Sequence, residues 1–124
     1  MQLTKVLALF AFTGGAFADC YKSGTVYHNK DEVSSAAKVA CDYGLSGDFG
    51  PENEFNSQKR GCINTLNGKV DFVVTHIDPG NQYLSPADCH KNLQREIYAC
   101  DHGGESNYGD FAYKSDPNEG SCST

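Results

Sequence analysis

The spacing of six cysteines constrains the fold of this 124-residue chain more than any other feature. Structural zinc sites place cysteines two to four residues apart, and no two cysteines here are so close. An even number of widely spaced cysteines in a small chain is instead typical of a disulfide framework. We therefore predict three disulfides and no metal site. Six cysteines allow fifteen pairings, and spacing does not choose among them. The cysteines are Cys20, Cys41, Cys62, Cys89, Cys100 and Cys122.

The first eighteen residues have the pattern of an export signal. Lys5 supplies a positive charge, residues 6–12 form an apolar run, and Ala16-Phe17-Ala18 is a small-x-small cleavage motif. The run is far shorter than the roughly twenty residues that a membrane-spanning helix needs. We expect cleavage after Ala18 and secretion of a single domain over 19–124, in an oxidising environment that suits the disulfides.

The charge balance restricts the class of partner. Loss of residues 1–18 removes Lys5 but no acid, so the formal net charge changes from −6 to −7. Nucleic acids and anionic lipids are bound by clustered cations, and this chain has no basic run. We expect no nucleic-acid partner, and the charge argues against a toxin that acts on membranes.

Periodicity and turn signals predict an order of strand, helix, hairpin, helix and strand. This order fits the split β-α-β arrangement, in which two helices cover one face of a four-stranded antiparallel sheet. The predicted fold is a single small disulfide-rich α+β domain of order βαββαβ. In chain order we predict a strand at 21–28, a helix at 31–43, strands at 60–66 and 69–77, a helix at 85–100 and a strand at 108–114.

The strongest local signals belong to the second helix and the hairpin. Ser85 is a good N-cap and Pro86 suits the first helical position. Asn67-Gly68 is the favoured dipeptide of a type I′ turn, because both central positions of that turn need positive φ. Residues 46–59 are predicted to form a long loop from which Phe49 and Phe55 turn inward.

A catalytic interpretation begins with the histidines, since the cysteines are assigned to disulfides. The best enzyme alternative is a small secreted ribonuclease of the fungal kind, which uses a Glu, a His and an Arg; the candidates are Glu54, His76 and Arg60. The resemblance is poor, because those enzymes have one helix before a long sheet. A Ca²⁺ loop at 116–120 is interrupted by Cys122. We expect no cofactor.

Binding is better supported than catalysis. Sugar recognition needs planar polar groups and aromatic faces on a rigid frame. Such residues are concentrated in the predicted loops, and those around the last strand are expected to form one polar patch, the alternative being ordinary turn residues. The candidate ligand-binding residues are Asp101, His102, Asn107, Tyr108, Asp116 and Asn118.

Several motifs, taken in order, resemble one family. They are Cys20-Tyr21-Lys22-Ser23-Gly24, Leu84-Ser85-Pro86-Ala87-Asp88-Cys89, E-I-x-x-C-x-H-G-G at 96–104 and D-P-N-x-G-x-C at 116–122. Together they resemble the small secreted fungal proteins typified by a mushroom glycan-binding protein.

The resemblance implies a cysteine-rich domain that binds glycans outside the cell without catalysis. A secreted effector or killer-toxin-like protein is the main alternative, because fold alone does not determine function. A single sugar site is weak, so useful avidity would require a second site or a homo-oligomer.

Overall fold

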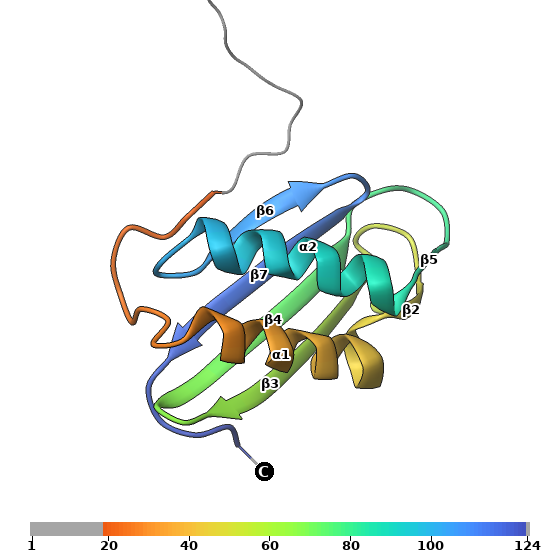
Figure 1. The fold of residues 1–124 in the computed structure, drawn as a ribbon. Helices are drawn as coiled ribbons and strands as arrows, with labels where there is room; N and C mark the ends of the chain where they lie inside the picture. The colour runs from red at the N-terminus through yellow and green to blue at the C-terminus, as the bar shows by residue number, and fades with distance from the viewer. Residues whose placement is uncertain (1–18, 124) are drawn as a thin grey trace, which may run out of the picture.

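Two helices lie on one face of a four-stranded antiparallel sheet (Figure 1). The computed structural model describes residues 19–123, so the predicted signal peptide over 1–18 lies outside the described residues. The strand order is β3-β4-β7-β6, and β2 pairs with β5 in a separate small sheet. The elements are α1 (Lys30–Ala40), the π-helical turn η1 (Cys41–Leu45), β2 (Gly47–Phe49), β3 (Gln58–Thr65), β4 (Gly68–His76), β5 (Gln82–Leu84), α2 (Pro86–Ala99), β6 (Gly104–Tyr108) and β7 (Phe111–Asn118).

The predicted fold class is confirmed, but the order of strands needs a correction. Residues 21–28 form no strand; an isolated bridge between Cys20 and Gly104 precedes them, and the Tyr27 hydroxyl lies 2.6 Å from the Ser115 hydroxyl oxygen of β7. The fourth strand comes from the other end of the chain, where the strand predicted at 108–114 is a hairpin, β6–β7, that turns at Gly109 with φ +68°. The order around the main sheet is therefore αββαββ.

Residues 116–118, which lie beyond the end of the predicted last strand, continue β7. Asp116 and Pro117 pair with Asp71 and Val70 of β4. A proline is tolerated there because β6 pairs with β7 only as far as Ser115, so beyond that point β7 has a neighbour on one side only.

Both helices begin as their cap residues predict. The Asn29 side chain accepts a hydrogen bond from the Glu32 amide at 3.0 Å, and the Ser85 hydroxyl accepts one from the Asp88 amide at 3.1 Å. The end of the first helix differs from the prediction. After Ala40 the chain widens into the π-helical turn, and only at Ser46 does it become extended.

The hairpin at Asn67-Gly68 is confirmed, but its turn is not type I′. Thr65 pairs with Gly68, which places Leu66 and Asn67 at the centre of the turn. Neither has positive φ, since Asn53 is the one non-glycine residue among 19–123 that does. Gly68 is required for another reason: a Cβ there would lie 2.4 Å from the carbonyl oxygen of Asn118.

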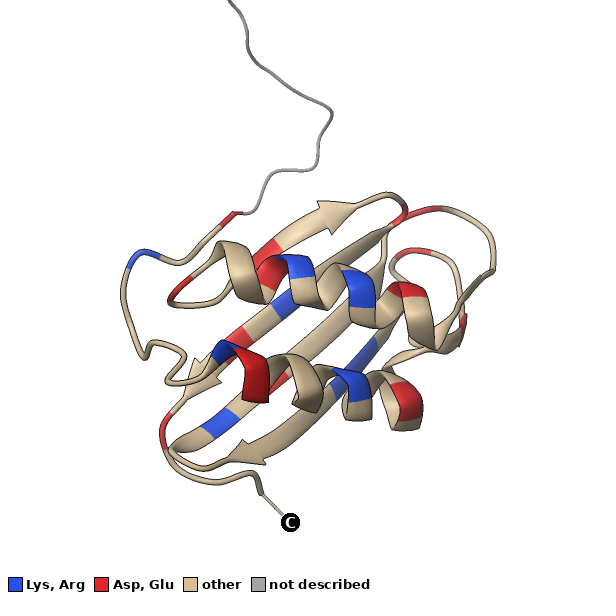
Figure 2. Cartoon of the chain, viewed as in Figure 1, with Lys and Arg blue, Asp and Glu red and all other residues tan. Residues whose placement is uncertain are grey.

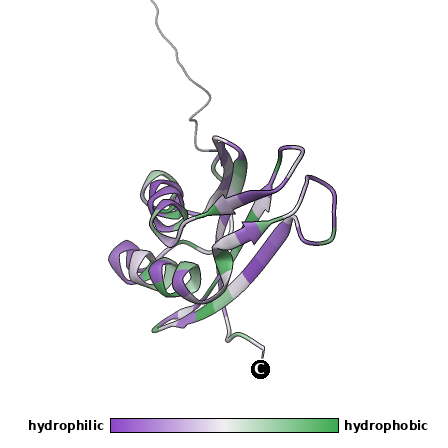
Figure 3. Cartoon of the chain, turned by 90° about the vertical axis from the view of Figure 1, so that its right-hand side faces the viewer, coloured by the Kyte–Doolittle hydropathy of each residue, from purple (hydrophilic) through white to green (hydrophobic). Residues whose placement is uncertain are grey.

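The core lies between the helices and the sheet. Alternate residues of β4 share one face of the strand and are all buried against the helices, and they are Val70, Phe72, Val74 and His76. Of the two loop phenylalanines, Phe49 is buried as predicted, but Phe55 is 96% exposed. Seen from the side, both helices stand on one side of the sheet and none of the described chain forms a helix on the other (Figure 3).

The three predicted disulfides are confirmed, and the structure supplies their pairing. Cys20–Cys100 joins the N-terminal segment to the end of α2, and Cys41–Cys89 joins the two helical regions. Cys62–Cys122 ties β3 to the segment after β7. Neither helix within residues 19–123 has the length and apolar character needed to cross a membrane.

Candidate functional site

The predicted ligand-binding residues on β6 are separated by the pleat of the strand. Tyr108 lies on the helix-covered face, is buried, and donates a hydrogen bond to Glu96 Oε1 at 3.0 Å. Asn107 is the next residue of the strand and faces the opposite way. Tyr108 is therefore part of the core rather than the rim of a patch.

Asp101 and His102 lie in the turn between α2 and β6, where they hold the N-terminal segment. Asp101 Oδ1 lies 2.8 Å from Lys30 Nζ, and this contact lowers the pKa of the carboxyl group below its usual range. His102 Nδ1 lies 3.0 Å from the carbonyl oxygen of Gly24. The described structure thus engages both side chains in internal contacts.

Asp116 and Asn118 belong to a larger surface, the face of the sheet turned away from the helices, here called the outer face. Asn118 Nδ2 donates to Asp71 Oδ2 at 2.8 Å across the β4–β7 pair. Lys69 Nζ lies 3.6 Å from the same oxygen. The structure therefore brings these two predicted residues together, but with side chains of β4 rather than with the other four.

The register of the sheet fixes which charged side chains share the outer face. Gly61 faces the helices, because a Cβ there would lie 3.6 Å from Leu45, so Arg60 on β3 must face outward. Arg60 pairs with Val73, and Val73 pairs with Lys114. On β4 and on β7 a lysine is followed two residues later by an aspartate, so basic and acidic residues lie side by side on these two strands (Figure 2).

A hollow of about 410 Å³ is centred on the outer face, and we call it the outer hollow. This volume lies within the range of roughly 300–1,000 Å³ that is usual for ligand pockets. Val73, which is 7% exposed, forms its floor. Two cations and two acids surround that floor, and the lining side chains are Arg60, Cys62, Asp71, Val73, Lys114 and Asp116.

A second recess of about 190 Å³, which we call the edge groove, lies between η1 and the outer edge of β3. It is bordered by Val39, Tyr43 and Ile63, and Tyr43 is 87% exposed. Arg60 lines both the edge groove and the outer hollow. The two recesses therefore flank one edge strand, β3. The π-helical turn displaces Tyr43 from the regular path of α1, and such insertions are common at functional sites.

The sequence contained a signal for the outer hollow but none for the edge groove. Because side chains alternate along a strand, Asp71 and Val73 of the predicted strand at 69–77 share one face, and the register of the sheet then adds their neighbours on β3 and β7. Tyr43 was predicted to end a regular helix, because a π-helical turn leaves no periodic signature in so short a segment.

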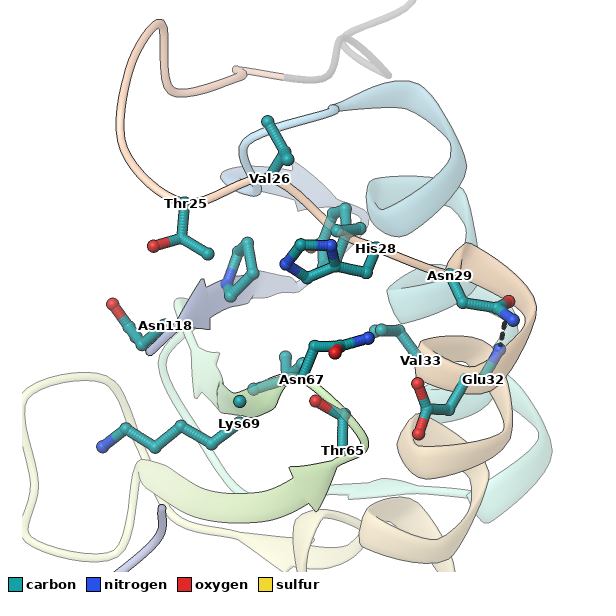
Figure 4. A pocket seen from close by; sticks show the side chains of 14 residues that line it. Thr25, Val26, His28, Asn29, Glu32, Val33, Thr65, Asn67, Lys69 and Asn118 are labelled. Atoms are coloured by element: carbon teal, nitrogen blue, oxygen red, sulfur yellow. Dashed lines mark hydrogen bonds between the residues drawn. The ribbon is translucent and has the colours of Figure 1, made fainter. Parts of the chain in front are cut away.

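A third recess is a crevice between the segment that precedes α1 and the β3–β4 turn (Figure 4). Its volume of about 10 Å³ accommodates about one water molecule. Glu32 Oε2 accepts a hydrogen bond from the Leu66 amide at 2.9 Å and so ties α1 to the turn. The crevice is therefore a structural joint, too small for a sugar.

The residues of the ribonuclease alternative do not come together. His76 is fully buried on the helix-covered face; its Nδ1 lies 2.8 Å from the carbonyl oxygen of Gly50 and its Nε2 lies 3.1 Å from Gln82 Oε1. Arg60 lies on the outer face, on the other side of the sheet. The imidazole and guanidinium groups therefore cannot act on one substrate in this arrangement.

Metal ligation receives no support from the described part of the chain. Within residues 19–123 there is no group of three or more His, Cys, Asp or Glu side chains arranged to hold an ion. The acid and amide of the considered Ca²⁺ loop, Asp116 and Asn118, are in β7.

Comparisons with protein-family models and with curated proteins identify no relative of this chain. No protein-family model matches the chain, and no curated protein matches it significantly. The resemblance to mushroom glycan-binding proteins therefore depends on the sequence motifs alone.

Proposed function

We propose that the protein binds glycans outside the cell and that the edge groove is its primary sugar site. The observation that carries this proposal is the exposed ring of Tyr43 at a recess that shares Arg60, a residue with a planar polar group, with the outer hollow. Three disulfides in a domain of this size are typical of extracellular proteins and support the proposed location.

The chemistry of the two recesses suits a sugar. An exposed tyrosine ring offers an apolar face to the C–H side of a pyranose and keeps its hydroxyl in water. The Arg60 guanidinium presents donors in a fixed plane, and carboxylates such as Asp71 accept hydrogen bonds from hydroxyl groups. The ligand would thus contact an apolar face and groups that both donate and accept.

The frame around the groove is rigid, which reduces the entropy lost on binding. Cys41, the first residue of η1, is bonded to Cys89 of α2, and Cys62 of β3 is bonded to Cys122. Lys59 Nζ donates to the carbonyl oxygen of Ser46 at 2.7 Å, which joins β3 to the residue after η1. Both walls of the edge groove are therefore cross-linked to the body of the domain.

A glycan array with the oxidised protein tests the proposal. We expect wild type to bind a restricted set of glycans and Tyr43→Ala to weaken binding about tenfold, since a lost aromatic contact is worth about 1 kcal/mol. Tyr83→Ala is the matched control, because Tyr83 is 62% exposed but lies on β5, outside both recesses. A blank array with correctly oxidised wild type would contradict the proposal.

One observation favours the second candidate, an effector that binds a protein partner. Phe55 is 96% exposed on a loop whose ends are held together, since the Gly50 amide donates to the carbonyl oxygen of Asn56 at 3.0 Å. An ordered loop that presents an aromatic ring to solvent suits a protein surface. A blank array would make this the leading function.

A further inference from the structure

The outer hollow has a charge arrangement that neutral sugars do not need, and it allows the proposed function to be made more specific. Arg60 and Lys114 lie opposite Val73 on either side, in one row across β3, β4 and β7. Neighbouring strands are about 4.8 Å apart, so the two backbone positions are roughly 10 Å apart. Both long side chains can reach an anion placed above Val73.

Within residues 19–123, neither of these two cations forms an ion pair, although Glu105 of β6 lies opposite Lys114 in the register of the sheet. Among the residues that the structure describes, ion pairs join Lys30 to Asp101, Lys38 to Asp42 and Lys69 to Asp71, and none involves Arg60 or Lys114. Each is therefore free to pair with a ligand. Arg60 is exposed and Lys114 half-buried, so neither side chain must leave the core to do so.

The next row of the outer face has the opposite charge. Asp71 pairs with Asp116, two residues along each strand from Val73 and Lys114, which is a separation of roughly 7 Å. Asp71 is oriented by Asn118 Nδ2 at 2.8 Å. Two cations thus lie beside two hydrogen-bond acceptors, at about the spacing of groups across one sugar ring.

This arrangement of charges disfavours both ligands that are anionic throughout and ligands that carry no charge. A polyanion such as nucleic acid would place phosphates against Asp71 and Asp116, and a neutral sugar would leave the cations without a partner. A ring with one carboxylate and several hydroxyl groups satisfies both rows. A carboxylate also matches the planar fork of an arginine in a bidentate contact.

We propose, building on the proposed glycan binding, that the outer hollow binds the carboxylate of a uronic acid. Arg60 and Lys114 bind the carboxylate above Val73, Asp71 and Asp116 accept hydrogen bonds from ring hydroxyls, and Tyr43 stacks on the adjoining sugar in the edge groove. The preferred ligand is therefore an acidic oligosaccharide with adjacent uronate residues.

Titration calorimetry with oligogalacturonate and its methyl ester tests this specificity. The ester has the same sugar rings but no charge. We expect wild type to bind the acid form at least tenfold more tightly, with a preference that shrinks at high salt because exposed charges are screened. Arg60→Gln combined with Lys114→Gln should remove the preference. Lys91→Gln is the control, because Lys91 is an exposed lysine of α2 outside both recesses.

The outcomes separate this specificity from glycan binding itself. Equal binding of acid and ester by wild type, lost in Tyr43→Ala, would keep the proposed function and overturn the uronate specificity. A uronate preference that survives in the double variant would also overturn it. If wild type of verified fold binds neither form and the glycan array is blank, both proposals fail.

Discussion

Glu96 is a carboxylate in the middle of the core, on α2. Its side chain is fully buried, and Tyr108 donates a hydrogen bond to it at 3.0 Å. Burial raises the pKa of Glu96, while hydrogen bonds from Ser106 and Tyr108 partly oppose the rise. The sequence offered no clear sign of this role, because a glutamate in a helix is almost always exposed.

Replacing Glu96 with glutamine should show how much the buried charge destabilises the folded protein. Because the pKa of Glu96 is raised in the folded state, its favourable contribution to stability is present at low pH and is lost as pH rises through the folded pKa. Glu96→Gln keeps the acceptor for Tyr108 without the charge. We expect it to raise Tm at neutral pH and to have little effect near pH 4, measured by thermal unfolding at both pH values.

Glu105→Gln is the matched control, since Glu105 is exposed on β6. It should leave the pH dependence of Tm unchanged. An equal fall in Tm for Glu96→Gln at both pH values would contradict the account, because it would mean that lost packing outweighs the charge.

Helices and strands that are marked by cap or turn residues in the sequence were predicted. Strands that form only by pairing with a distant strand were not. The start of α2 and the β3–β4 hairpin follow from Ser85 and Asn67-Gly68. Residues 104–108 have low strand propensity and became a strand only because β7 lies beside them. Residues 21–28 contain better strand formers, but none of them pairs as a strand, and the only isolated bridge to the sheet within residues 19–123 is at the preceding Cys20.

The β3–β4 turn and the end of β7 are packed so closely that Gly68 should be intolerant of a side chain. The Cβ of Gly68→Ala would lie 2.4 Å from the Asn118 carbonyl oxygen, and φ at this position is +151°. We expect a loss of about 1–3 kcal/mol in the free energy of unfolding, measured by denaturant titration. In Gly44→Ala the new Cβ meets no described atom within 4 Å, so a change below about 0.5 kcal/mol is expected. Equal effects of the two substitutions would refute the close-packing explanation.

At the scale of the whole molecule, the disulfides join segments that are not paired with each other in a helix or a sheet. The sequence predicted that they form but not which residues pair, because pairing depends on how the helices and the C-terminal segment lie on the sheet. The candidate site also depends on tertiary structure, namely on how the strands are aligned in the sheet. Arg60, Asp71 and Lys114 lie far apart in sequence and meet only through register.

Removing the Cys62–Cys122 disulfide tests how much the attachment of the C-terminal segment contributes to the stability of the fold. This disulfide closes a sequence separation of 60 residues, and chain entropy alone assigns it about 4 kcal/mol. We expect Cys62→Ser with Cys122→Ser to lower the free energy of unfolding by about 2–4 kcal/mol while far-UV circular dichroism stays native. The hydrogen bond from the Cys122 amide to Asn64 Oδ1 at 2.7 Å should be lost as the segment detaches. An unchanged denaturation midpoint would show that the segment is held without the bond.

The position of β3 at the edge of the sheet has a consequence for solubility. An open edge strand is a template for pairing with another chain, and charged side chains along it discourage aggregation. The bridge at Cys20 partly covers the opposite edge, β6, whereas β3 carries Lys59 and Arg60. The arginine assigned to ligand recognition therefore also protects the protein against edge-to-edge aggregation, so selection on either property acts on the other.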